Sequence, residues 1–141
     1  RFMWQGIGEA MLTPLLAAAL ALQDAPPEPV APSTSAEIIS LDDLPIDQAA
    51  AARCAMAFAI VSRWQKAGDA RGSAYPDMEA GGGREFFVRT MAQLMDSAGW
   101  TRDGIVELTF REAAATDNPA GEARIKAMMP ACQMMKSAAG L

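Results

Sequence analysis

Histidine is absent from this 141-residue sequence. Without an imidazole the chain can form neither a Ser-His-Asp nor a Cys-His catalytic set, and it lacks the usual general base near neutral pH. It also lacks the side chain that zinc and copper sites use most often. We therefore expect a protein that is not an enzyme and that carries no cofactor.

Basic residues are also few, with 12 Lys and Arg against 17 Asp and Glu and a formal net charge of -5. They are scattered along the chain rather than gathered in one segment. Binding to nucleic acid needs Lys and Arg clustered into a patch that neutralises phosphates. The sequence therefore argues against nucleic acid as a partner, and against an acidic membrane surface for the same reason.

Long hydrophobic runs are missing, because no apolar stretch approaches the roughly 20 residues of a membrane-spanning helix. Leu15–Leu22, LLAAALAL, has the length of the apolar region of a signal peptide, and it contains the small-x-small pattern Ala19-Leu20-Ala21. With translation starting at Met11, we expect the signal peptidase to cut after Ala21. No Lys or Arg lies between Met11 and the apolar run, whereas a signal peptide usually has a basic residue there. We expect residues 1–21 to be a signal peptide with its upstream residues, in preference to a buried helix or an uncleaved anchor.

A proline-rich segment follows the apolar run. Asp24–Ser35 reads DAPPEPVAPSTS, in which each proline removes a backbone donor that a helix or a sheet would need. Glu37–Ile46 alternates weakly between polar and apolar residues, which favours an extended lead-in. Residues 22–45 are thus predicted to be a disordered linker with its lead-in, and residues 46–141 to be a helical domain.

Four helices and no strand are predicted within residues 46–141. The expected helices span 47–67, 84–98, 102–115 and 119 to 137 or 139, and their ends are marked by capping residues and glycines. These markers are Asp47 and Thr101 as N-caps, Gly68 and Gly99 just past C-terminal ends, and Asn118 ahead of Pro119. The predicted fold class is all-α, a small four-helix bundle.

The spacing of apolar residues predicts which helix faces are buried. The inward rows are Cys54, Phe58, Val61 and Trp64 on the first helix and Ile125, Met128, Met129, Cys132 and Met135 on the last. On the second helix Phe87 belongs to the inward row, so Phe86 is expected to point outward. On the third helix the row of Ile105 and Leu108 competes with that of Val106 and Phe110, and spacing does not decide between them.

Cysteine is also scarce, and only Cys54 and Cys132 are present. Each lies on the apolar face of its own helix, so packing of the first helix against the last would bring them together. A structural disulfide would close most of the domain into one loop and stabilise it by roughly 4 to 5 kcal/mol. It would also suit the oxidising compartment that a signal peptide implies. The alternative is a pair of buried free thiols.

Methionine is abundant, with ten in the chain. Met128, Met129, Met134 and Met135 place four thioethers on neighbouring turns of the last helix, and thioethers are ligands for Cu(I). A periplasmic copper carrier is therefore an alternative function, although filling of an irregular helical core explains these residues more simply. The segment Gly81–Arg84 at a helix start could cradle an anion, but without phosphate-binding spacing a connector is the simpler interpretation.

Exposed aromatic side chains would be the remaining sign of a protein partner. Phe86 and Trp100 are the candidates, although core packing explains these rings more simply and no motif identifies the partner. We expect the mature protein to be periplasmic or secreted, without a membrane span. Its expected role is non-catalytic binding, as an accessory subunit, an inhibitor or a chaperone-like protein.

Overall fold

The computed structural model describes residues 39–141, which form helices and no strand. The α-helices are α2 (Ile46–Lys66), α3 (Gly83–Ala98), α4 (Arg102–Thr116) and α5 (Pro119–Ala138), and the short 3-10 helices are η1 (Leu41–Asp43) and η2 (Ala70–Ala74). The predicted all-α fold class is confirmed. The predicted signal peptide and most of the predicted linker lie outside the described residues. Within residues 39–141, no helix combines the length and the apolar character needed to cross a membrane.

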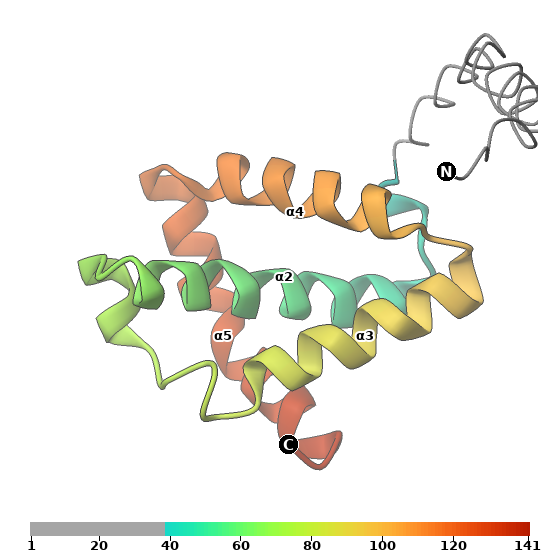
Figure 1. Ribbon diagram of the computed structural model, residues 1–141. Helices are drawn as coiled ribbons and strands as arrows, with labels where there is room; N and C mark the ends of the chain where they lie inside the picture. The colour runs from blue at the N-terminus through green and yellow to red at the C-terminus, as the bar shows by residue number, and fades with distance from the viewer. Residues whose placement is uncertain (1–38) are drawn as a thin grey trace, which may run out of the picture. The chain divides into compact units, whose positions relative to one another are not determined.

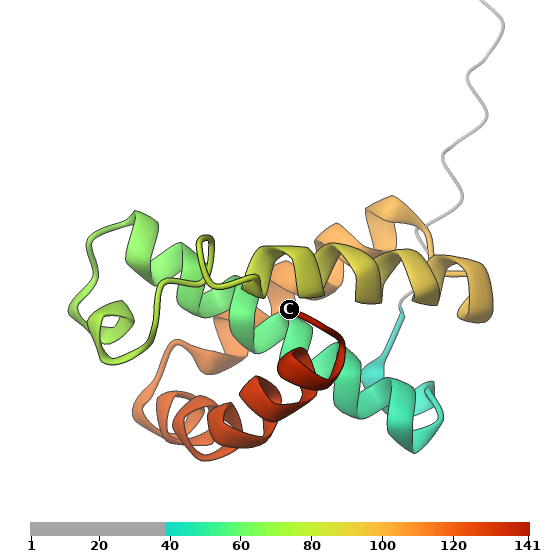
Figure 2. The ribbon, with the colours of Figure 1, turned by 90° about the horizontal axis from the view of Figure 1, so that it is seen from below.

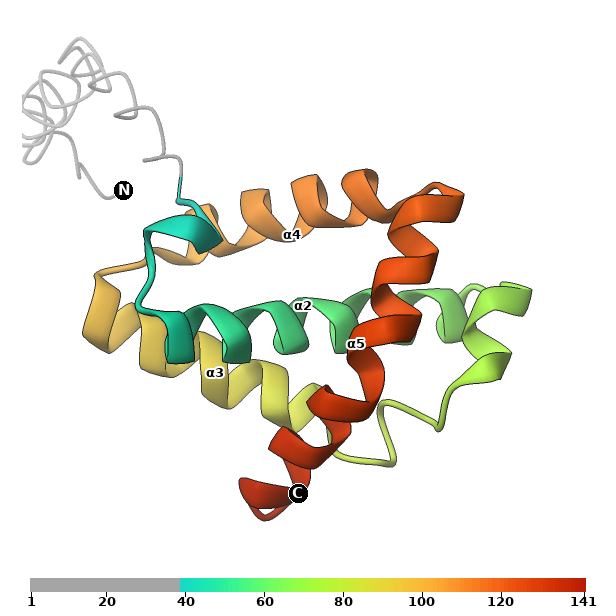
Figure 3. The same ribbon diagram turned by 180° about the vertical axis from the view of Figure 1, so that it is seen from behind.

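Helix α2 is at the centre of the described domain. It lies between α3 and α4, α3 runs antiparallel to it, and α5 crosses it on one side (Figures 1 and 3). Seen from below, α3 and α5 lie on opposite sides of α2 (Figure 2). The alanines of α2 favour a helix. Ala52, Ala55 and Val61 are completely buried, and Phe58 is 1 % exposed. The core is therefore built around α2.

The disulfide joins α2 to α5. Cys54 and Cys132 are bonded, with their Cα atoms 5.2 Å apart, and both are buried. This confirms the bridge expected from the sequence and excludes the alternative of two free thiols.

The helix ends follow local capping, with one correction. Thr101 and Asn118 accept hydrogen bonds from the N–H groups of Gly104 and Gly121 and so cap α4 and α5 as predicted. Asp47 was predicted to cap α2, but α2 begins at Ile46 after Pro45. The carboxylate of Asp47 therefore lies in the first turn, where it interacts favourably with the helix dipole instead of capping a backbone N–H.

The segments around α2 contain short helical turns. Residues Leu41–Asp43 form one 3-10 turn where extended chain was expected, with Ser40 as its cap and Leu41 buried in the core. After α2 the chain turns through η2, and Gln65 holds this loop in place. The Gln65 side-chain amide donates to the carbonyls of Gly72, Tyr75 and Pro76, and its oxygen accepts the N–H of Met78.

The triple glycine before α3 is a tight turn. Gly82 has φ of +81°, a region that residues with a Cβ rarely adopt. A Cβ on Gly83 would stand 2.9 Å from the Met78 carbonyl oxygen, and the N–H of Arg84 already donates to that same oxygen. The glycines thus serve the turn, which agrees with the connector interpretation rather than with an anion cradle.

Helix α3 is rotated relative to the sequence prediction. Phe86, expected to point outward, is only 5 % exposed and meets Phe58 edge to face with 5.5 Å between ring centroids. Phe87 is half-buried at the margin of the core. The inward row begins at Gly83 and includes Thr90, which is buried. Because Thr90 is polar, the buried row could not be recognised from the spacing of apolar residues.

Candidate functional site

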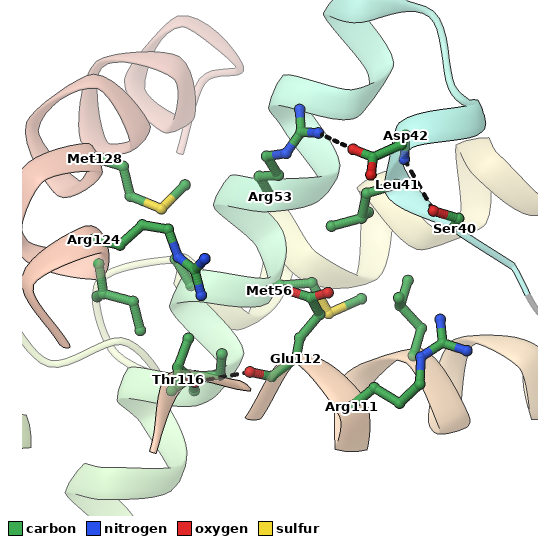
Figure 4. A pocket seen from close by; sticks show the side chains of 14 residues that line it. Ser40, Leu41, Asp42, Arg53, Met56, Arg111, Glu112, Thr116, Arg124 and Met128 are labelled. Carbon is green, nitrogen blue, oxygen red and sulfur yellow. Dashed lines mark hydrogen bonds and ion pairs between the residues drawn. The ribbon is translucent and has the colours of Figure 1, made fainter. Parts of the chain in front are cut away.

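A cavity of about 380 Å³ opens between η1, α2, α4 and α5 (Figure 4). Its walls include the core side chains Leu41, Met56, Ile60, Leu108 and Ile125. The volume lies near the lower end of the range typical for small-molecule sites. The cavity therefore has apolar side chains on its inner wall and is open to the surface.

The rim of the cavity is polar and carries three arginines and two carboxylates. Arg53 from α2 donates to Asp42 at 2.8 Å, so these two charges neutralise one another. Arg111 from α4 donates to the backbone carbonyl of Ile39 at 2.5 Å. Arg111 thereby ties the start of the described chain to α4, and no carboxylate of residues 39–141 forms an ion pair with it.

Arg124 and Glu112 differ from the other rim residues. Among residues 39–141, neither side chain takes part in an ion pair or a hydrogen bond, whereas Arg111, which also has no ion-pair partner there, donates to the Ile39 carbonyl. Figure 4 shows Arg124 extending from α5 and Glu112 from α4 toward the middle of the cavity. Both side chains therefore have hydrogen-bonding capacity for a bound molecule.

The lining charge is opposite in sign to the charge of the whole chain. Three arginines against two carboxylates leave one positive charge in excess around the cavity, whereas the sequence has a net charge of -5. A guanidinium beside an apolar wall is suited to a carboxylate, because its planar fork can donate two parallel hydrogen bonds. The arrangement is suited to binding an anionic group that is attached to an apolar body.

The four methionines proposed for copper do not converge. Met129 is buried with 6 % exposure and Met134 is 74 % exposed, so these two side chains leave α5 on different sides. Met128 and Met135 are half-buried and pack against the core, and Met128 also lines the cavity. Within the described residues, no group of three or more His, Cys, Asp or Glu side chains is placed to hold a metal ion.

The two aromatic residues proposed as partner contacts are both buried. Phe86 packs on Phe58 as described above, and Trp100 is 7 % exposed. After the turn at Gly99, the N–H of Trp100 donates to the carbonyl of Leu94, which directs the chain back over the core. The expectation that these rings are surface contacts is therefore wrong.

The exposed apolar residues lie elsewhere. On α4 the row of Ile105 and Leu108 is buried, whereas Val106 is 48 % and Phe110 64 % exposed. This settles the alternative that the spacing left open. Because 105, 108, 112 and 116 lie on the inner side of α4, the exposed phenylalanine is turned away from the cavity.

A second charged group holds the η2 loop against the junction of α4 and α5. Arg71 pairs with Asp69 at 2.6 Å, Asp117 at 2.8 Å and Glu122 at 3.2 Å. Its guanidinium also lies 4.7 Å from the ring centroid of Trp64. The hydrogen bonds from the Arg71 side chain and backbone lower the pKa of Asp69 from 3.8 to about 2.

We expect acid to weaken this Arg71 cluster. Because the folded pKa of Asp69 is below its ordinary value, its charge stabilises the fold above about pH 4, and this contribution is lost as the pH falls toward 2. The urea midpoint should therefore decrease between about pH 6 and pH 2.5, and Asp69→Asn should make that decrease smaller. Asp96→Asn, at an exposed site on α3, should leave it unchanged. An identical pH dependence in all three proteins would contradict the prediction.

Sequence reasoning did not identify the cavity. Its arginines come from α2 and from the consecutive helices α4 and α5, and only the packing of α5 across α2 brings them to one opening. The one local signal was that Arg124 precedes Met128 by four residues, which places both on the same face of a helix.

The chain matches no protein-family model. No curated protein and no solved structure shows significant similarity to it.

Proposed function

We propose that this chain is an exported, non-catalytic binding protein whose binding site is the cavity between η1, α2, α4 and α5. The observation that supports this most strongly is the combination of a core-lined interior with Arg124 and Glu112, which have no ion-pair partner among residues 39–141. Such convergent polar groups on an apolar wall are typical of ligand sites. The absence of histidine from the sequence favours binding over acid–base catalysis.

Export is supported by two independent features. The apolar run Leu15–Leu22, with its predicted cleavage after Ala21, is typical of a signal peptide. The Cys54–Cys132 disulfide suits a compartment that oxidises thiols. Intact mass of the chain recovered outside the cytoplasm should correspond to a mature protein that starts at Leu22. Recovery of an uncut, fully reduced chain from the cytoplasm would contradict this part of the proposal.

The binding role is tested by photo-crosslinking in the native host. A photoreactive phenylalanine analogue at Met128, on the cavity wall, is expected to capture a bound molecule and give a species of discrete added mass. The matched control is the same analogue at Val88, an exposed position on α3, which should give none. Absence of a specific adduct at Met128, or the same adduct at both positions, would overturn the assignment of this cavity as the binding site.

A further inference from the structure

From the charge and size of the cavity we infer that it takes a monocarboxylate with a short apolar chain, held by Arg124 and by the apolar wall. This inference rests on the proposed binding function and specifies its ligand. The three arginines at the rim of the cavity differ in their hydrogen-bond and ion-pair partners. Arg53 is neutralised by Asp42, and Arg111 donates to the Ile39 carbonyl. Arg124 is the cavity-lining guanidinium that makes neither an ion pair nor a hydrogen bond within residues 39–141.

The charge of the ligand follows from the rim. One excess positive charge matches a single negative charge, and the carboxylate of Glu112 on the opposite side of the opening disfavours a dianion such as a phosphate monoester. A planar carboxylate also fits the guanidinium fork, with two N–H groups donating to two oxygens. We therefore assign the anionic group of the ligand to the Arg124 side, away from Glu112.

The size of the ligand follows from the volume. A cavity of about 380 Å³ corresponds to about a dozen water molecules at roughly 30 Å³ each, and hence to a ligand with about a dozen non-hydrogen atoms. Decanoate has this size. Its chain would lie against Met56, Leu108 and Ile125, which are at most 2 % exposed, so the apolar area removed from water would be mainly that of the ligand.

The experiment uses the full oxidised chain with ¹³C-labelled methionine methyl groups. The probe is sodium decanoate, titrated below the concentration at which it forms micelles. We expect saturable shifts of the Met56 and Met128 signals, because both residues line the cavity, and no shift of Met134, which is 74 % exposed on another side of α5. Acetate tests the need for the chain, decanol the need for the charge, and decyltrimethylammonium the sign of the charge, and each should bind at least about tenfold more weakly than decanoate.

Two variants at the rim should change affinity in opposite directions. Arg124→Gln should weaken decanoate binding about tenfold or more, because a charged hydrogen-bond donor is lost. Glu112→Gln should tighten it about threefold, because a like charge is removed. Arg102→Gln, an exposed site outside the cavity, is the matched control and should leave binding unchanged.

The outcomes separate this inference from the proposed function. Equal binding of decanol and decanoate, or no effect of Arg124→Gln, would overturn the assignment of an anionic ligand. Absence of decanoate binding together with a specific crosslink at Met128 would overturn the ligand class and leave the binding site in place. Absence of both would overturn the inference and the proposed function together.

Discussion

Replacing both Cys54 and Cys132 with alanine is expected to lower the free energy of unfolding by about 4 kcal/mol. The bridge joins residues 78 positions apart, and in the chain-entropy model a loop of that length stabilises the folded state by about 4.5 kcal/mol. Both sulfur atoms are also buried, so their loss removes contacts at the crossing of α2 and α5. For a domain of this size the midpoint of thermal unfolding should decrease by roughly 15 to 30 °C.

Urea unfolding of the oxidised protein, the reduced protein and the double variant measures this effect. The double variant also serves as the control for effects of the reductant itself. Dithiothreitol should lower the free energy of unfolding of the native sequence and leave that of the variant unaltered. Equal stability of the native protein with and without reductant would show that the bridge does not stabilise the fold.

The second large effect is expected from Phe86→Ala, which should lower the free energy of unfolding by about 3 to 5 kcal/mol. Phe86 is 5 % exposed and its ring meets Phe58 edge to face, so truncation leaves a void between α2 and α3. Phe110→Ala removes the same ring from α4, where it is 64 % exposed. That change should stay within about 0.5 kcal/mol.

This pair is measured by urea unfolding of the two variants beside the native protein, all of them oxidised. Both variants lose the same phenyl ring, which is buried at Phe86 and exposed at Phe110. The pair therefore tests whether the face of α3 that carries Phe86 is the inward one. A destabilisation by Phe110→Ala as large as that by Phe86→Ala would contradict the described packing. A negligible effect of Phe86→Ala would restore the orientation of α3 that apolar spacing had predicted.

Helix positions could be predicted because their ends are determined locally. Thr101, Asn118 and Gly99 act on the backbone groups next to them, so their effect can be inferred from a few neighbouring residues. The disulfide was also predictable, since two cysteines on apolar faces have only each other as partners. Asp47 was misassigned because a proline ahead of it can begin a helix without any side-chain cap.

Helix rotation and the cavity could not be predicted in the same way. The buried row of α3 contains Thr90 and starts at Gly83, and neither residue contributes to an apolar pattern. The cavity exists only because α5 crosses α2 and approaches α4, which depends on distant contacts. Arg124 resembles any surface arginine until α4 and η1 are placed beside it.

The crossing of α2 by α5 also has a consequence for how the chain matures. Cys54 lies in the first α-helix of the described domain and Cys132 in the last. A chain that emerges with its N-terminal part first presents Cys54 as a lone thiol until almost all of the domain has emerged. During that interval α2 and α3, which are neighbours in sequence, can pack by themselves. Because the chain has two cysteines, it has no incorrect internal pairing, and oxidation before α5 arrives can link Cys54 only to another molecule.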